Sequence, residues 1–293
     1  NCTKDFFELS GLSDDKYVII TSPTQFKKIS VPSETMFALS GHASKAFLEY
    51  FDLLKENVEK VSTPSKHKKI YLTRTQLENS GSFNEEYYEN FFKSIGYKII
   101  SPEKYSLAEQ INFIMNAEDI VCTMGTLAHL VLFANNNVNL TILLREPKTI
   151  IHAQFAVNLL RGVNCSYVES TNNFLPTSHV YGMIFFSPTE YFYKYLDDNN
   201  CKYEVEGINY EQIGRFIYEY ANWYKQIKHF KRIANTTSFD FINEISKGLL
   251  GESLDSKKYK KWISTSDNIT DKLEKKIEKL ENELSKIKNS RSY

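Results

Sequence analysis

The sequence of 293 residues contains no apolar run that approaches the roughly 20 residues a helix needs to cross a bilayer, so we predict no spanning helix. It has no excess of charge of either sign, because 36 lysines and arginines balance 36 aspartates and glutamates. Nucleic acid is therefore not an expected partner. The G-x-G-x-x-G and P-loop patterns are also missing, so the two commonest glycine-rich nucleotide fingerprints are not indicated.

Cysteine is sparse and widely spaced, at Cys2, Cys122, Cys165 and Cys201. No two cysteines form a C-x-x-C pair, and none joins a cluster with histidine, so neither a metal site nor a bound cofactor is expected. Cys122 lies in an apolar run and is typical of a buried thiol. Reduced cysteines are usual in the cytoplasm, which is where we expect the protein to reside.

Predicted strands and helices alternate in the middle of the sequence. Strands are predicted over 69–74, 97–100, 119–123 and 140–144, with helices over 84–95, 106–117 and 125–134. Ser106 followed by Glu109 has the spacing of a capping box. Alternation of this length predicts an α/β fold with a Rossmann-like parallel sheet covered by helices on both faces.

Four regions are predicted along the chain. They are a partial N-terminal α/β region (1–66), the Rossmann-like domain (67–165), an extension that packs on the core (166–235) and a C-terminal tail (236–293). In the first region, residues 16–21 and 26–31 are strand candidates, and residues 43–58 have helical spacing.

Two later helices raise the question of partners. The predicted helix over 210–233 carries an aromatic stripe with basic residues, which fits either a membrane surface or, more simply, a packed core. Residues 270–288 repeat apolar residues at spacings of four and three, which predicts a coiled-coil-like helix. That helix would form a homo-oligomer, fold back on the body or remain an exposed charged helix.

Polar residues follow two of the predicted strands at their carboxyl ends, the edge where open α/β sheets bind ligands. Thr73 and the permanently charged Arg74 close the first strand, and Gly125 and Thr126 open a helix after the third. An arginine offers a fixed fork of donors, and a glycine turn exposes backbone N–H groups. Together they predict an anion site. A surface salt bridge for Arg74 and a simple connecting turn at Gly125 are the plainer interpretations.

Other candidates have equally simple alternatives. Glu109 and Gln110 could contact ribose or other hydroxyls, although a capping box already explains Glu109. His129 lies one turn after Gly125 and is either a ligand contact or a core histidine. His42 precedes the helix at 43–58 and either faces a cleft or caps that helix.

This set of residues resembles family 61 glycosyltransferases, whose bacterial members act in capsular polysaccharide biosynthesis. The resemblance covers roughly residues 27–145 and rests on short motifs in a fixed order, which are Ile70-Tyr71-Leu72-Thr73-Arg74, Asn84-Glu85, Ser106 with Glu109-Gln110, Ala117, Gly125-Thr126 and Phe133. Val31-Pro32-Ser33 and Gly41-His42 resemble the segment before this core. Two positions depart from the family: Met124 stands where a histidine is frequent, and His129 where an asparagine is common.

The resemblance implies an inverting, metal-independent enzyme of the GT-B type, with two Rossmann-like domains facing each other across a cleft. Arg74, Thr73, Glu109, Gln110, Gly125, Thr126 and His129 would lie on the nucleotide-sugar side, and His42 is the candidate base. The acceptor would be a bacterial surface polysaccharide or glycolipid. The acceptor-side region is short, so it is either reduced or part of a longer protein. A scaffold protein and a pyruvyl transferase of similar architecture are the alternatives.

Overall fold

The computed structural model divides the chain into two compact units, Asn1–Glu206 and Gly207–Tyr293, and each is described by itself. The structure describes residues 2–37, 42–77, 81–147, 151–177, 183–205, 209–226, 238–257 and 259.

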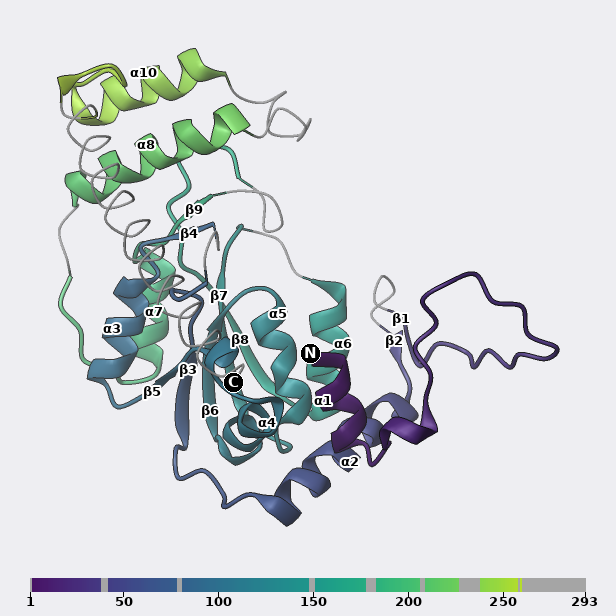
Figure 1. Ribbon diagram of the computed structural model, residues 1–293. Helices are drawn as coiled ribbons and strands as arrows, with labels where there is room; N and C mark the ends of the chain where they lie inside the picture. The colour runs from purple at the N-terminus through teal and green to yellow at the C-terminus, as the bar shows by residue number, and fades with distance from the viewer. Residues whose placement is uncertain are drawn as a thin grey trace, which may run out of the picture. The chain divides into compact units, whose positions relative to one another are not determined.

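The first unit is built on a five-stranded parallel sheet, as the alternation of elements predicts (Figure 1). Its strands, in spatial order, are β5 (Lys98–Ile100), β3 (Lys69–Leu72), β6 (Asp119–Thr123), β7 (Asn139–Leu144) and β8 (Asn164–Glu169). The strand β8 is absent from the prediction. It lies at the edge of the sheet and alternates exposed with partly buried residues, so it lacks the apolar run that marks β6 and β7.

Alternate side chains of the strands enter two separate cores, because successive residues of a strand point to opposite faces. Ile70 and Leu72 of β3 join the core beneath α2, α4 and α6, and Tyr71 between them joins an aromatic core beneath α3 and α7. Figure 1 shows these two groups of helices on opposite faces of the sheet. The helices of this unit are α1 (Cys2–Leu9), α2 (Lys45–Val61), α3 (Glu86–Ser94), α4 (Leu107–Asn116), α5 (Thr126–His129), α6 (His152–Arg161) and α7 (Glu190–Asp198).

Local sequence signals account for several helix ends. The Ser106 side chain accepts from the Glu109 N–H while the Glu109 carboxylate accepts from the Ser106 N–H, which confirms the predicted capping box at α4. Thr189 caps α7 with one bond, in which its hydroxyl accepts from the Phe192 N–H. Gly162 ends α6 in the left-handed conformation, with φ of 59°, which glycine adopts without strain.

The two strands expected at 16–21 and 26–31 are wrong. The described residues between η1 (Asp14–Lys16) and β1 (Met36–Phe37) form no strand, because no neighbouring strand lies beside them to accept their backbone hydrogen bonds. Next to them in the described sequence is the short antiparallel ladder of β1 with β2 (His42–Ala43). A separate two-residue parallel ladder joins β4 (Ser82–Phe83) to β9 (Ile184–Phe185).

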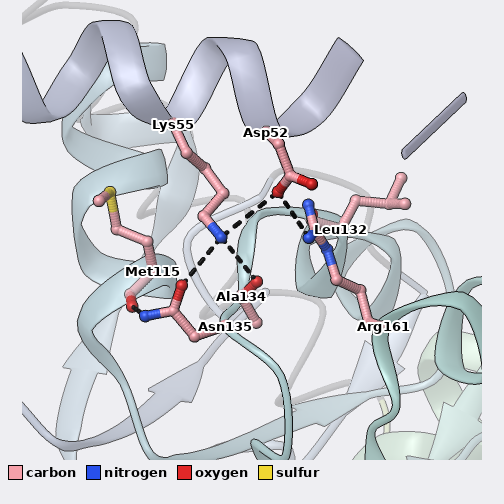
Figure 2. Close-up of polar contacts among 7 residues, drawn as sticks. All are labelled: Asp52, Lys55, Met115, Leu132, Ala134, Asn135 and Arg161. Carbon is pink, nitrogen blue, oxygen red and sulfur yellow. Dashed lines mark hydrogen bonds and ion pairs between the residues drawn. The ribbon is translucent and has the colours of Figure 1, made fainter. Parts of the chain in front are cut away.

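A polar clamp attaches α2 to the sheet domain (Figure 2). The Arg161 Nε donates to the buried Leu132 carbonyl at 2.6 Å, and its NH1 contacts Asp52 Oδ1 at 2.7 Å. Lys55 Nζ donates to the Ala134 carbonyl and to Asn135 Oδ1 at 3.1 and 2.9 Å. Burial and the charge of Arg161 lower the pKa of Lys55, and Asp52 opposes this. The clamp fixes the strand connections between β6 and β8 to α2.

The second unit contains α8 (Tyr210–Gln226) and α10 (Phe239–Leu250), which pack against each other. The apolar stripe of α8 is buried at Phe216, Ile217 and Tyr220, as expected for a core-packing helix. Among the described helices, none has both the length and the apolar character that crossing a bilayer requires. The predicted coiled-coil helix at 270–288 lies outside the described residues.

We expect the clamp to contribute measurably to stability. Arg161→Met removes the donor to the buried Leu132 carbonyl and lowers the free energy of unfolding by about 2 kcal/mol in urea denaturation. The matched control is Lys45→Met, which breaks the exposed pair of Lys45 with Glu49 and changes stability by less than about 0.5 kcal/mol. Equal effects of the two changes would show that the clamp contributes no more than a surface ion pair.

Candidate functional site

The candidate site lies where the strand order of the sheet reverses. From β3 the chain adds β5 on one side, and then β6, β7 and β8 on the other. The carboxyl ends of β3 and β6 therefore flank the switch point, which is the ligand-binding position in open α/β sheets. Arg74 follows β3 and Gly125 follows β6, so the strand order places them on either side of this position.

Arg74 and Gly125 are direct neighbours. A Cβ atom added to Gly125 would lie 3.3 Å from Arg74 NH1, so the guanidinium passes close over the glycine backbone. Gly125 has φ of 132° and ψ of −154°, a conformation almost restricted to glycine. The Arg74 Nε is buried and makes no hydrogen bond within the described residues. A donor of this kind, held beside an open turn, is suited to an anionic ligand.

Glu85 holds the segment that carries Arg74. It is the N-cap residue of α3 and is almost fully buried. Its Oε1 accepts the Arg74 backbone N–H at 3.0 Å and the Tyr71 hydroxyl at 3.4 Å. Its Oε2 is buried without a hydrogen bond in the described part of the chain. The carboxyl group therefore positions the Arg74 backbone and leaves the guanidinium available.

Arg145 adds a second cation to this edge. It directly follows β7, the neighbour of β6, and is buried. Burial and the nearby charge of Arg74 lower its pKa to about 10, and Glu85 opposes the shift. Arg145 is absent from the predicted site. The signal that marks Arg74, a cation just after an apolar parallel strand, is also present at Arg145 and could have identified it.

Glu85 places a carboxyl group near these two guanidinium groups. Burial raises the pKa of Glu85 to about 7, although the Arg74 N–H and the charges of Arg74 and Arg145 stabilise the ionised form. A carboxyl group with this pKa is partly protonated near neutral pH. It therefore carries only part of a negative charge, and the two guanidinium groups beside it suit a phosphate-like anion.

Thr73 lies behind the site. Its side chain is buried, and its hydroxyl donates to Glu89 Oε2 at 2.9 Å. The Thr75 hydroxyl donates to the same carboxylate oxygen at 2.7 Å. These bonds attach the loop after β3 to α3, so the structure places Thr73 as a support for the neighbouring Arg74.

Gly125 and Thr126 open a short helical segment, as expected, but only its first four residues are α-helical. The helix α5 has four residues and continues as the 3₁₀ turn η3 (Leu130–Phe133). So short a helix has a small dipole, and its contribution is the free N–H groups of its first turn. Thr126 is exposed at the start of this turn.

His129, at the end of α5, is half-buried and close to Gln154 of α6. Burial lowers its pKa, and Gln154 opposes the shift. Its Nδ1 is buried without a hydrogen bond in the described residues. Gln154 itself donates to the Ala128 carbonyl at 3.1 Å. The imidazole is therefore neutral at pH 7 and keeps a polar atom unused.

The remaining predicted residues have other positions. Glu109 is exposed and engaged in the capping box of α4, and Gln110 donates to the Tyr105 carbonyl at 3.0 Å. The helix α4 follows β5, and β5 lies on the other side of β3 from β6, which Gly125 follows. In the described structure, no hydrogen bond joins Glu109 or Gln110 to Arg74. His42 lies in β2, which packs beside α6. The His42 side chain is not among those that the structure describes.

The described residues contain no group of three or more His, Cys, Asp or Glu side chains placed to hold a metal ion. What the site offers is a pair of guanidinium groups, a glycine turn and a partly neutral carboxyl group. This arrangement can bind and stabilise a multiply charged anion.

Comparison with known proteins points to one family. Residues 7–141 match the family model described as "Glycosyltransferase 61", which covers less than half of the chain. No curated protein matches the chain. The match includes Arg74, Glu85 and Gly125 and ends shortly before Arg145. It supports a glycosyltransferase related to family 61.

We expect Gly125→Ala to impair anion binding through the Arg74 contact. The added methyl group displaces the guanidinium and weakens binding of inorganic pyrophosphate at least tenfold by calorimetry. The matched control is Gly96→Ala. Gly96 also has a positive φ, of 93°, but open space at its Cβ position. Both changes cost about 1–3 kcal/mol of stability from backbone strain. Equal pyrophosphate affinity in the two variants would contradict the arrangement of Arg74 over Gly125.

We expect Glu85 to make stability depend on pH. Folding raises its pKa from the ordinary 4.5 to about 7, so the folded state holds the extra proton between these values and stability falls as pH rises through this range. Glu85→Gln cannot ionise, so its stability relative to the natural protein rises by about 2–3 kcal/mol from pH 4.5 to 7.5. The exposed neighbour variant Glu86→Gln serves as the control. If the difference in unfolding free energy between the Glu85→Gln variant and the natural protein does not change with pH, a raised pKa of Glu85 is excluded.

Proposed function

We propose that the chain is an inverting, metal-independent glycosyltransferase of the GT-B type that transfers a sugar from a nucleotide-sugar donor. The acceptor is a bacterial surface polysaccharide or glycolipid, and the reaction takes place in the cytoplasm. The observation that carries the proposal is the contact of the Arg74 guanidinium with the Gly125 turn at the switch point of the sheet.

The chemistry of sugar transfer supports this assignment. When the bond between sugar and nucleotide breaks, negative charge develops on the departing diphosphate. Donors fixed in advance around that charge lower the barrier. Arg74, Arg145 and the N–H groups after Gly125 would supply these donors without a metal ion. Since Glu85 is partly protonated, its own carboxyl group offsets their positive charge only in part.

The other donor-side residues take supporting or outer roles in this proposal. Thr73 holds the loop of Arg74 through Glu89. Thr126 is exposed beside the glycine turn and can donate to a phosphate oxygen, and His129 can donate to the sugar or ribose hydroxyls. Glu109 and Gln110 lie farther along the same edge, at the start of α4, where the nucleoside would extend.

The acceptor side is less defined. An acceptor hydroxyl needs a carboxylate or imidazole base within hydrogen-bond reach, and His42 is the proposed base. A GT-B enzyme has a second Rossmann-like sheet facing the first. The described residues of 2–37 and 42–66 form α1, η1, a short ladder and α2 rather than such a sheet, so the facing-domain arrangement stays a prediction.

Two alternatives give different expectations for ligands. A pyruvyl transferase would use the same cationic edge for phosphoenolpyruvate, which carries both a phosphate and a carboxylate. A scaffold protein that forms homo-oligomers through residues 270–288 would need no small ligand at all. The neighbouring guanidinium groups of Arg74 and Arg145 at the switch point favour an enzyme over a scaffold, since they suit an anionic ligand.

We expect Arg74→Ala to reduce kcat/KM for nucleotide-sugar turnover by about 100- to 1,000-fold, because a donor to the departing diphosphate is lost. Arg74→Lys keeps the charge but loses the fork of donors and is intermediate. Arg215→Ala, which removes an exposed arginine paired with Glu211, is the control and retains full activity. If the Arg74→Ala variant keeps the kcat/KM of the natural protein, and circular dichroism shows an intact fold, the proposed role is refuted.

A thermal-shift panel separates the alternatives. The enzyme proposed here is stabilised by nucleoside diphosphates and nucleotide sugars, since a ligand that binds only the folded state raises the melting temperature. Stabilisation by phosphoenolpyruvate alone would indicate the pyruvyl transferase. The absence of any shift would favour the scaffold.

A further inference from the structure

A second surface of the first unit differs in chemistry from the candidate site. Between η1 and β1 the chain presents six large apolar side chains to solvent, each with between 50% and 82% of its surface exposed. They are Val18, Ile19, Ile20, Phe26, Ile29 and Val31. Isolated exposed apolar residues are common, but six within fourteen positions form the kind of concentration that marks an interaction surface.

This segment, residues 17–34, is held at both ends and open in between. At its start, the ring of Tyr17 packs on Phe7 of α1 with centroids 4.5 Å apart. At its end, the Ser44 N–H donates to the Thr35 carbonyl at 2.8 Å, next to the β1–β2 ladder. Figure 1 shows the segment as the long dark purple loop that projects from the body and returns to β1. The six exposed apolar side chains lie between these two anchors.

Most of the segment carries charge of one sign. Residues 17–33 contain Lys27 and Lys28 and no aspartate or glutamate, and Glu34 ends the segment. This contrasts with the whole chain, in which the two signs balance. Lys27 and Lys28 are exposed and stand between Phe26 and Ile29, so cationic and apolar side chains share one part of the loop.

We propose that residues 17–34 dock the protein on an anionic membrane surface, with the apolar side chains in the boundary between headgroups and acyl chains and the lysines on the lipid phosphates. The proposal is independent of the proposed function, because it uses no residue of the anion site.

Two features favour a lipid surface over a protein partner. Exposed apolar residues on both sides of a lysine pair, with no acidic residue over residues 17–33, match the composition of interfacial membrane-binding segments. The loop has no regular backbone pattern that would define a shape-complementary groove or a sheet edge. At the headgroup boundary its unpaired backbone groups still have water and lipid headgroups as partners, whereas burial in a dry protein interface would leave them unsatisfied.

The test is co-sedimentation of the full chain with vesicles of phosphatidylcholine containing about 30 mol% phosphatidylserine. We expect the natural protein to bind these vesicles. The triple variant Ile19→Ser, Ile20→Ser and Phe26→Ser loses at least tenfold in partitioning. The matched control, Phe155→Ser with Leu159→Ser, removes apolar side chains that are 58% and 72% exposed on α6 and leaves binding within about twofold. Circular dichroism of each variant checks the fold.

The electrostatic part has its own control. Lys27→Glu with Lys28→Glu weakens binding to the anionic vesicles at least tenfold, and so does raising the salt concentration. Lys93→Glu with Lys98→Glu, a charge reversal at exposed lysines outside the segment, does not.

Several outcomes would overturn the proposal. They are no binding by the natural protein, equal binding by the triple serine variant, equal binding to pure phosphatidylcholine vesicles, and equal losses in the test and control variants. A dimer in sedimentation velocity that the triple serine variant dissociates would assign the segment to contact between two copies instead.

Discussion

Two guanidinium groups at one edge of a parallel sheet, with a glycine beneath one of them, are the constraint on which the account depends. Burial and the nearby charge of Arg74 lower the pKa of Arg145. Glu85 opposes this shift, and burial favours its own protonated form. A phosphate-like anion would be attracted to the two guanidinium groups, and this is why we expect a ligand of that kind.

The surrounding fold holds these groups in place. Parallel pairing of β3, β6 and β7 sets their carboxyl ends side by side, and the residues that follow share one edge. Glu85 fixes the backbone of Arg74, while Thr73 and Thr75 join the same loop to Glu89. On the opposite face of the sheet from α3, the clamp of Arg161 with Asp52 attaches α2. Rigid support of this kind keeps the Arg74 guanidinium over Gly125 in the absence of a ligand.

Much of the sheet could be predicted from periodicity, because β3, β6 and β7 are apolar runs between polar helix ends. The edge strand β8 could not, since its exposed residues interrupt the pattern. Residues 16–31 have strand-forming composition. A strand also needs a neighbouring strand to pair with, and the sequence of the segment alone does not show whether one is present. Arg74 and Gly125 were accessible through the rule that ligands bind at the carboxyl ends of strands. Glu85 was not singled out as a site residue, because nothing in the sequence shows that its carboxylate turns inward to the Arg74 backbone. The burial that shifts its pKa arises only from tertiary packing.

The most direct test of the central claim is a crystal structure of the chain with a bound nucleoside diphosphate. The account predicts phosphate oxygens within about 3 Å of the Arg74 guanidinium and of the N–H groups that follow Gly125, with Arg145 facing the same phosphates. A nucleotide bound elsewhere, with the edge between β3 and β6 empty, would contradict it.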